Sequence, residues 1–205
     1  MMQIKNISTM IFDLGGVIYN IDIQKGIDNF KKIGFINADN YIGKFTHSGF
    51  FIQWEKGEIT PETFRNEIKK LSNNPLTDKQ IDDAWCSIML DIPRERIDLL
   101  LALRKKYKLL LLSNTNYIHI NRSLPEELAK FGLTMDELFD KCYYSYLLGA
   151  IKPHADIFEK LLQDAQVKPE ECLFLDDGEK NILTAKSLGF NTYHVTPGES
   201  LDFLK

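Results

Sequence analysis

The chain has 205 residues, and 25 Lys and Arg against 29 Asp and Glu give it a formal net charge of −4 at pH 7. This length suits one domain with a sizeable insertion better than two independent domains, and 44% hydrophobic with 26% charged residues excludes a disordered or fibrous chain. The mild acidity disfavours broad binding to nucleic acid or to an anionic membrane, because both need clustered Lys and Arg.

Short apolar runs that end abruptly in polar residues predict buried strands. The first run is Thr9–Phe12, and it ends at Asp13. Apolar runs without alternation are typical of strands that are buried on both faces of a parallel sheet. We therefore expect a parallel sheet whose first strand along the chain is this one.

The next stretch, 21–92, has no strand-like run and is predicted to be helical. Pro61 suits the first position of a helix, and Thr77–Gln80 has the capping-box pattern. Its aromatic side chains supply apolar area for a small core: Phe30, Phe45, Phe50, Phe51, Trp54, Phe64 and Trp85. We therefore expect a helical cap at 21–92, inserted into a core that is formed by 1–20 and 93–205.

After this insertion, predicted helices and strands alternate along the chain. Helices are predicted from apolar residues at helical spacing at Arg94–Tyr107, Ala155–Ala165 and Asn181–Leu188. Strands are predicted at Leu109–Leu112, Cys142–Tyr146, Cys172–Leu175 and Asn191–Val195. This alternation indicates an α/β fold with a mostly parallel sheet.

Polar side chains with useful chemistry follow three of these strands. They are Asp13, Ser113–Asn114 and Asp176–Asp177. Taken singly, each could cap a helix or a turn. Ligands of open parallel sheets bind beyond the carboxyl ends of the strands, however, so the three groups together predict a site at one edge of the sheet.

The residue types at this edge suit phosphoryl transfer. Carboxylates of Asp13 and Asp177 would offer Mg²⁺ the oxygen ligands that it prefers. The Ser113 hydroxyl can donate a hydrogen bond to a phosphoryl oxygen, and Lys152 can place a point charge on the same group. A carboxylate nucleophile, a divalent ion, a hydroxyl and a lysine are the parts of phosphoryl transfer through an aspartyl-phosphate.

Four segments in this order resemble the motifs of the haloacid dehalogenase-like (HAD) hydrolase superfamily. They are DLGGV at 13–17, LSN at 112–114, KP at 152–153 and LDD at 175–177. The resemblance covers the whole chain, including a helical cap inserted just after the first motif. It implies a three-layer Rossmann-like α/β core.

Two further segments are similar to the α-D-glucose-1-phosphate phosphatase branch of the superfamily. These are WEKGEI at 54–59 and LSNTN at 112–116. For the metal site, the resemblance implies Mg²⁺ held by Asp13, by the backbone carbonyl of Gly15 and by one acid of the Asp176–Asp177 pair. Asp177 is the preferred ligand of the two.

The resemblance also implies roles around the phosphate. Asp13 would be the nucleophile, and Ser113 and Lys152 would hold the transferring phosphoryl group. Asn114 would line the pocket, and Asn116 is expected to join it near the pocket mouth. His119 lies in the same segment and is a weaker candidate for the same region.

The chain departs from the family pattern at Gly15. Most phosphatases of the superfamily have a second Asp there, two residues after the nucleophile, which protonates the leaving group and then activates water. Three explanations stay open: a leaving group that needs no proton, another proton donor, or a protein that binds phosphorylated ligands with little turnover. Asp22 and His47 of the cap are the nearest alternative donors, although helix capping and surface positions are more common roles for both.

The predicted function is a Mg²⁺-dependent phosphatase of small phosphorylated metabolites such as sugar phosphates, because a covered site excludes large substrates. A 2-haloacid dehalogenase is the main alternative. It also attacks with an Asp and has no acid two residues later, but it works without metal, and the doubled acid at 176–177 favours a metal. A third hypothesis is a weakly active protein that binds phosphorylated ligands.

The remaining features predict no other partner. The cysteines, Cys86, Cys142 and Cys172, are too few and too scattered for a disulfide framework or a CxxC metal site. No apolar run approaches the ~20 residues that a membrane helix needs, and no signal-peptide pattern is present. We expect a cytoplasmic monomer or homodimer that binds neither nucleic acid nor membrane.

Overall fold

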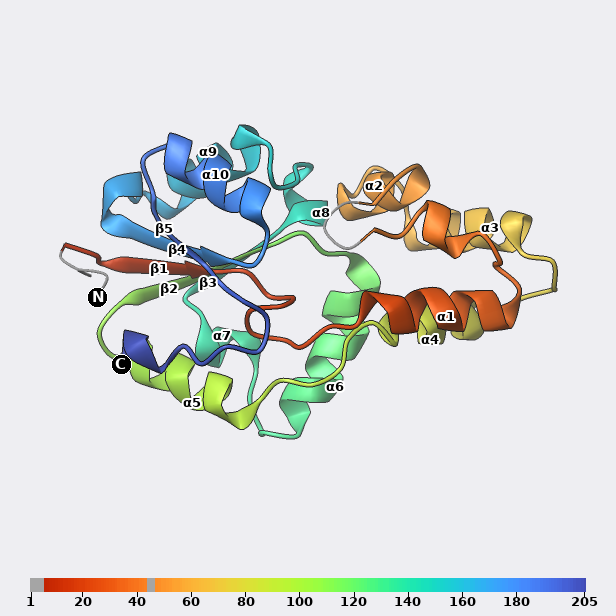
Figure 1. Ribbon diagram of the computed structural model, residues 1–205, viewed down its shortest axis with the longest axis horizontal. Helices are drawn as coiled ribbons and strands as arrows, with labels where there is room; N and C mark the ends of the chain where they lie inside the picture. The colour runs from red at the N-terminus through yellow and green to blue at the C-terminus, as the bar shows by residue number, and fades with distance from the viewer. Residues whose placement is uncertain (1–5, 44–46) are drawn as a thin grey trace.

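The core of the molecule is a sheet in which all paired strands are parallel (Figure 1). The computed structural model describes residues 6–43 and 47–205. Within them the strands are β1 Thr9–Phe12, β2 Lys108–Ser113, β3 Lys141–Tyr144, β4 Cys172–Asp176 and β5 Asn191–His194, in the spatial order β3-β2-β1-β4-β5. Phe12 pairs with Leu111 of β2 and Leu175 of β4, so these three strands end at nearly the same level.

The burial of the strands explains their apolar sequences. β1 and β4 are buried at every residue, and β2 is buried after its first residue, whereas β5 at the edge is half exposed. The predicted strands at these places are confirmed. The strand predicted at Cys142–Tyr146 was wrong at its end, because Ser145 and Tyr146 begin the short helix α8, Ser145–Leu148.

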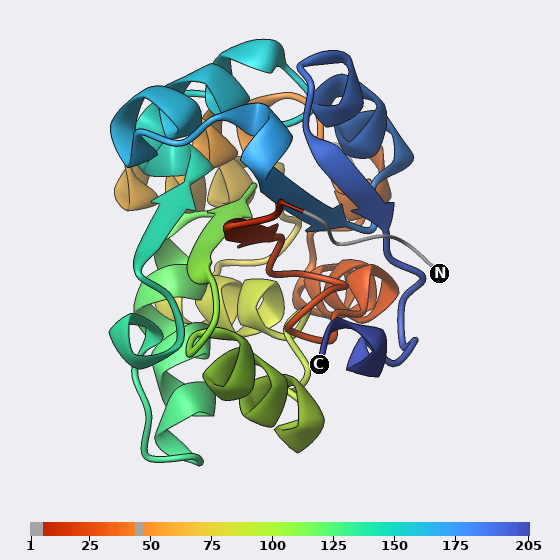
Figure 2. The ribbon, with the colours of Figure 1, turned by 90° about the vertical axis from the view of Figure 1, so that its left-hand side faces the viewer.

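Helices cover both faces of the sheet and complete three layers (Figures 1 and 2). One face is covered by α5 Arg94–Leu103, α6 Leu124–Ala129 and α7 Met135–Leu138, and the other by α9 Ala155–Ala165 and α10 Glu179–Ser187. Met10 and Phe12 point into the first layer, whereas Ile11 points into the second, as the alternation of side chains along a strand requires. The α/β fold and its three layers are confirmed.

Two helix boundaries differ from the sequence prediction. The helix predicted to run to Tyr107 ends at Leu103, where the chain turns and Lys106 and Tyr107 both donate backbone hydrogen bonds to the Leu103 carbonyl. The helix predicted from Asn181 begins two residues earlier, at Glu179. Among the helices of the described residues, none is long and apolar enough to cross a membrane.

Four helices between β1 and α5 form a layer of their own beyond the ends of the strands (Figure 1). They are α1 Ile23–Ile33, α2 Phe50–Glu55, α3 Pro61–Leu71 and α4 Asp78–Cys86. Their starts follow local chemistry: Thr60 accepts a hydrogen bond from the Thr63 N–H, and Thr77 forms a capping box with Gln80. We call α1–α4 the inserted helices.

The inserted helices bury an aromatic core separate from the two cores on the sheet. Phe51 and Phe64 meet edge to face at 5.1 Å, and Trp54 stacks on Phe64 at 4.9 Å. The aromatic core predicted from the sequence includes Phe45, which lies outside the described residues. Short turns complete the chain: η1 Ala38–Asn40, the π-helical turn η2 His119–Ser123, η3 Pro169–Glu171 and η4 Asp202–Leu204.

The contact between the inserted helices and α8 depends on Gly57. Its φ is +69°, and an added Cβ would lie 2.0 Å from the Tyr146 carbonyl oxygen. We therefore expect Gly57→Ala to lower the free energy of unfolding by more than the ~1–3 kcal/mol of left-handed strain alone. Gly149→Ala is the matched control, because its φ is +63° and no atom lies within 4 Å of its added Cβ. Equal losses for the two variants in urea unfolding would contradict the expectation.

Candidate active site

The ends of the central strands and the inserted helices enclose a cavity of about 120 Å³. From the core it is lined by residues that include Asp13, Gly15, Ser113, Asn114, Lys152 and Asp177. From the inserted segment it is lined by Ile21, His47, Glu55 and Trp85, among others. Most residues predicted for the site therefore line the same cavity.

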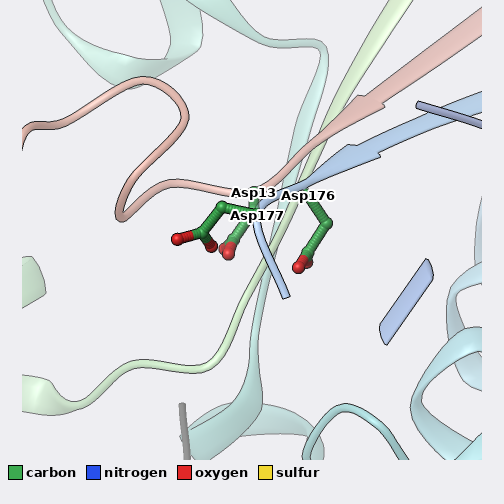
Figure 3. Close-up of side chains that lie close together, drawn as sticks. All are labelled: Asp13, Asp176 and Asp177. Carbon is green, nitrogen blue, oxygen red and sulfur yellow. The ribbon is translucent and has the colours of Figure 1, made fainter. Parts of the chain in front are cut away.

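Three carboxylates lie close together at the carboxyl ends of β1 and β4 (Figure 3). Asp13 follows β1, Asp176 is the last residue of β4, and Asp177 follows it. One oxygen of each lies within 4.8 Å of the others. The register of β1 on β4, which pairs Phe12 with Leu175, brings these carboxylates together.

Lys152 lies between two of the acids and is almost completely buried. Its Nζ lies 2.9 Å from Asp13 Oδ1, and it donates hydrogen bonds to Asp176 Oδ2 at 2.6 Å and to the Leu112 carbonyl at 2.9 Å. Burial works to lower the pKa of Lys152, but the negative charges of Asp13 and Asp176 outweigh it and raise the pKa. The ammonium therefore stays charged.

The ionised form of Asp13 is disfavoured even though Lys152 lies beside it. Burial raises the pKa of Asp13 to about 7, the charge of Lys152 opposes the rise, and repulsion from Asp176 and Asp177 adds to it. A divalent cation among the three carboxylates would oppose both burial and repulsion and would keep Asp13 ionised.

The two acids of the pair have different surroundings. Asp176 is fully buried, and its Oδ1 accepts hydrogen bonds from Gly178 N at 2.7 Å and from Asn181 Nδ2 at 2.8 Å, while Lys152 engages its Oδ2. Asp177 lines the cavity, whereas Asp176 does not. Gly16 makes room for the Asp177 carboxylate, because an added Cβ there would lie 2.5 Å from Oδ2.

The carboxyl end of β2 contributes its last residue, Ser113, and the following Asn114 to the cavity. Asn114 is tied to the backbone of Lys152: its Nδ2 donates to the Lys152 carbonyl at 2.8 Å, and its Oδ1 accepts from Lys152 N at 2.8 Å. This pair of bonds holds Lys152 beside β2, where its side chain reaches the carboxylates. Asn114 thus positions Lys152 as well as lining the cavity.

Asn116 is not among the residues that line the cavity, and it is completely buried. Its Nδ2 lies 3.1 Å from His119 Nδ1, and its Oδ1 accepts from His119 N at 3.1 Å. His119 Nε2 lies 3.1 Å from the Trp85 carbonyl, so its ring links the core to α4. Burial lowers the pKa of His119 to about 4, which leaves a neutral ring.

The two alternative proton donors of the inserted segment, Asp22 and His47, lie in different surroundings. Asp22 is exposed and caps α1, where its Oδ1 accepts from Lys25 N at 3.0 Å. His47 lines the cavity instead, with its Nε2 3.4 Å from Glu55 Oε1. Burial lowers the pKa of His47 to about 4 and raises that of Glu55 to about 7, which the charge of Lys152 opposes.

Glu55 is the residue that the sequence prediction missed. It lies in WEKGEI at 54–59, where Glu58 has the same chemistry and is exposed. The sequence gives no local signal that separates these two carboxylates. Only the packing of α2 against α8 turns one of them toward the cavity.

The place of the missing second Asp is filled from the inserted segment. Gly15 has no positive φ, and an added Cβ would meet Ile21 Cδ1 at 3.3 Å and Ile21 Cγ2 at 3.5 Å. A side chain at this position would therefore have to displace Ile21 by a few tenths of an ångström. Ile21 also lines the cavity.

Comparison with known proteins gives consistent results. A family model of haloacid dehalogenase-like hydrolases matches residues 7–189. A curated D-ribitol-5-phosphate phosphatase from Bacteroides thetaiotaomicron is 37% identical over 196 residues, which are 96% of this chain and 94% of that protein.

Solved structures of other HAD-family proteins are also similar to this chain. A HAD-family enzyme from Bacteroides thetaiotaomicron, in complex with magnesium and inorganic phosphate, is 42% identical, with a TM-score of 0.90 and coverage of 97% of this chain and 98% of that one. A predicted HAD-like hydrolase from Porphyromonas gingivalis is 37% identical, with a TM-score of 0.89 and coverage of 96% and 94%. An L-2-haloacid dehalogenase at 16% identity, with a TM-score of 0.54 and coverage of 96% and 89%, shares the fold alone.

Proposed function

Because this chain belongs to the haloacid dehalogenase-like hydrolases, we propose that it is a Mg²⁺-dependent phosphatase of small polyhydroxy phosphate esters. One observation carries the proposal: Asp13 and Lys152 form a buried ion pair beside a cluster of three carboxylates, at the carboxyl ends of parallel strands. A buried carboxylate nucleophile next to a cationic site is the arrangement that phosphoryl transfer through an aspartyl-phosphate needs.

The donor set fits magnesium, because it consists of oxygens from three carboxylates that lie within 4.8 Å of one another. Asp13, Asp177 and the Gly15 carbonyl would hold the ion, and Asp176 would orient Lys152. Bound there, the ion would neutralise charge on the phosphoryl oxygens.

This chain's own groups do the rest of the chemistry. Asp13 attacks phosphorus, while the Ser113 hydroxyl and the Lys152 ammonium hold the phosphoryl oxygens. The domain boundaries also belong to this proposal: residues 21–92 act as a cap over a core formed by 1–20 and 93–205. The cap encloses the ester and excludes bulk water during transfer.

The substrate class follows from the cavity and from the curated relative. A cavity of about 120 Å³ suits a small metabolite. The relative at 37% identity is a phosphatase of ribitol 5-phosphate, a linear sugar-alcohol ester. We therefore place sugar phosphates and sugar-alcohol phosphates first among the substrates.

A phosphate-release screen tests the function. We expect turnover of pentose, hexose and pentitol phosphates with Mg²⁺ and complete loss after chelation, restored when Mg²⁺ is returned. Halide release from 2-chloropropionate without metal would instead favour the dehalogenase reading, which Gly15 motivates. Ligand-induced thermal stabilisation by inorganic phosphate without any turnover would favour a binding protein.

Substitution of Gly15 by Asp tests whether the active site can use an acidic side chain at this position. We expect Gly15→Asp to lower kcat by about tenfold, because the new side chain must displace Ile21 and adds a negative charge beside the Asp13 nucleophile. Gly15→Ala introduces the Cβ without the charge and is the control. A higher kcat for Gly15→Asp than for the unmodified enzyme would contradict this expectation.

A further inference from the structure

Glu55 is the acidic side chain that the inserted helices present to the cavity. It is the last residue of α2, and its side chain is 13% exposed. It lines the same cavity as Asp13, Ser113 and Lys152, and the charge of Lys152 acts on it. A buried carboxylate of the inserted helices therefore shares one cavity with the groups at the strand ends.

The backbone of Glu55 is fixed to the core by Ser145. The Ser145 hydroxyl donates to the Glu55 carbonyl at 2.7 Å and accepts from Thr115 N at 2.9 Å. Thr115 lies two residues after Ser113. One buried hydroxyl therefore sets the position of Glu55 relative to the segment that holds the phosphoryl group, which is the precision that proton transfer needs.

His47 lies beside one of the two carboxyl oxygens of Glu55. Its Nδ1 accepts from Gly43 N at 3.3 Å, so the neutral ring has its proton on Nε2, the nitrogen that lies 3.4 Å from Glu55 Oε1. Oε1 is therefore the oxygen beside His47, and we assign the transferred proton to the other oxygen, Oε2. Because burial holds the pKa of His47 at about 4, the imidazole stays neutral and does not become a cationic partner.

Burial also tunes the acidity of Glu55. It raises the pKa of this carboxyl to about 7, with the charge of Lys152 acting in the opposite direction. Both the protonated and the ionised form are therefore populated near neutral pH. A group that must first give a proton and then take one works best in this range.

We propose that Glu55 is the general acid and base of the reaction, the role that Gly15 leaves vacant. This inference rests on the proposed phosphatase function. It assigns the role to a residue of the cap, whereas the family pattern has it on the loop after β1.

In the first step, Asp13 forms a bond to phosphorus, and the bond from phosphorus to the ester oxygen breaks. The electron pair stays on the ester oxygen, which takes the proton from Glu55 Oε2 and leaves as an alcohol. In the second step, Glu55 carboxylate takes a proton from water, whose oxygen bonds to phosphorus as the bond to Asp13 breaks. The products are the alcohol and hydrogen phosphate, and both carboxyl groups return to their starting states.

The test compares leaving groups in Glu55→Gln. With an alkyl phosphate such as ribitol 5-phosphate, we expect kcat to fall by about 10²–10⁴-fold, because the alkoxide needs a proton to leave. p-Nitrophenolate leaves without one, so p-nitrophenyl phosphate should give a burst of one p-nitrophenol per active site. Slow turnover should follow, because Gln cannot activate water.

Glu58→Gln is the matched control, since Glu58 lies three residues away, is exposed and does not line the cavity. It should behave as the unmodified enzyme does. An unchanged kcat in Glu55→Gln would overturn the inference. So would a rise in KM for the polyol ester with no burst, which would make Glu55 a ligand of substrate hydroxyls.

The pH profile of the unmodified enzyme gives a second test that needs no variant. Protonated Glu55 is lost as the pH rises through its pKa, so kcat/KM for the alkyl ester should fall above about pH 7 while that for p-nitrophenyl phosphate should not. Among residues 6–43 and 47–205, the other ionisable groups that face Glu55 are His47, which is neutral over this range, and Lys152. Parallel profiles would overturn the inference, and absence of turnover with every ester would instead overturn the proposed function.

Discussion

Asp13→Asn is expected to abolish phosphate release. We expect kcat to fall by about 10⁴-fold or more, which is the usual loss when the nucleophile of an enzyme is removed. The amide is uncharged and does not attack phosphorus. Its oxygen can still accept the hydrogen bond that Leu14 N donates to Asp13 Oδ1 at 2.7 Å, so the local backbone should be kept. Phosphate release from ribitol 5-phosphate with Mg²⁺ measures the effect.

Stability of the same variant separates loss of chemistry from loss of fold. The pKa of Asp13 is raised by burial to about 7, so its ionised form opposes folding above the unfolded-state pKa. Neutral Asn removes that penalty, although it also removes the ion pair with Lys152. We therefore expect the urea concentration at the unfolding midpoint, measured near pH 8, to be close to that of the unmodified enzyme. Retained turnover in a folded Asp13→Asn variant would remove Asp13 as the nucleophile.

Lys152→Met is expected to produce the largest loss of stability, about 3–5 kcal/mol in the free energy of unfolding near pH 7. The lysine is the cation between Asp13 and Asp176, and all three groups are buried. Methionine fills a similar volume but leaves the two carboxylates without a counter-charge. Urea denaturation at several pH values measures the loss.

The pH dependence of that loss identifies its origin. Without Lys152, the pKa of Asp13 rises further above its unfolded value, so the deficit is full above that pKa and shrinks as the pH falls. Added Mg²⁺ should recover part of the stability by replacing the missing charge. Lys105→Met is the control, because Lys105 is exposed in the turn after α5, and its free energy of unfolding should stay within about 0.5 kcal/mol of that of the unmodified enzyme. A pH-independent deficit would show that packing, not charge, is responsible.

The core of the site could be predicted from the sequence because strand ends carry its chemistry. Buried strands have continuous apolar sequences, and in a parallel sheet their carboxyl ends meet at one edge. Asp13, Ser113 and Asp176 each follow such a run directly, and Asp177 comes one residue later, so their meeting required only the strand assignment. Lys152 follows no strand, so it was proposed for the site from its charge and from the resemblance to the family and not from the strand pattern.

The face of the cavity that the inserted helices form could not be predicted in this way. Glu55 and Glu58 lie on the same short stretch, and the docking of α2 on α8 decides which of them is buried. Asn116 was expected near the pocket mouth, but its amide holds His119. Contacts between helices depend on tertiary geometry, and the local sequence does not encode it.

The single proton of Ser145 has a consequence for how the two parts of the molecule separate. The hydroxyl oxygen lies 2.7 Å from the Glu55 carbonyl and 3.0 Å from the Thr115 carbonyl. If the inserted helices separate from the core at this contact, rotation about one side-chain bond would transfer the donated bond from the first acceptor to the second. Such a separation would leave the Ser145 donor satisfied, so this link would add little to its free-energy cost.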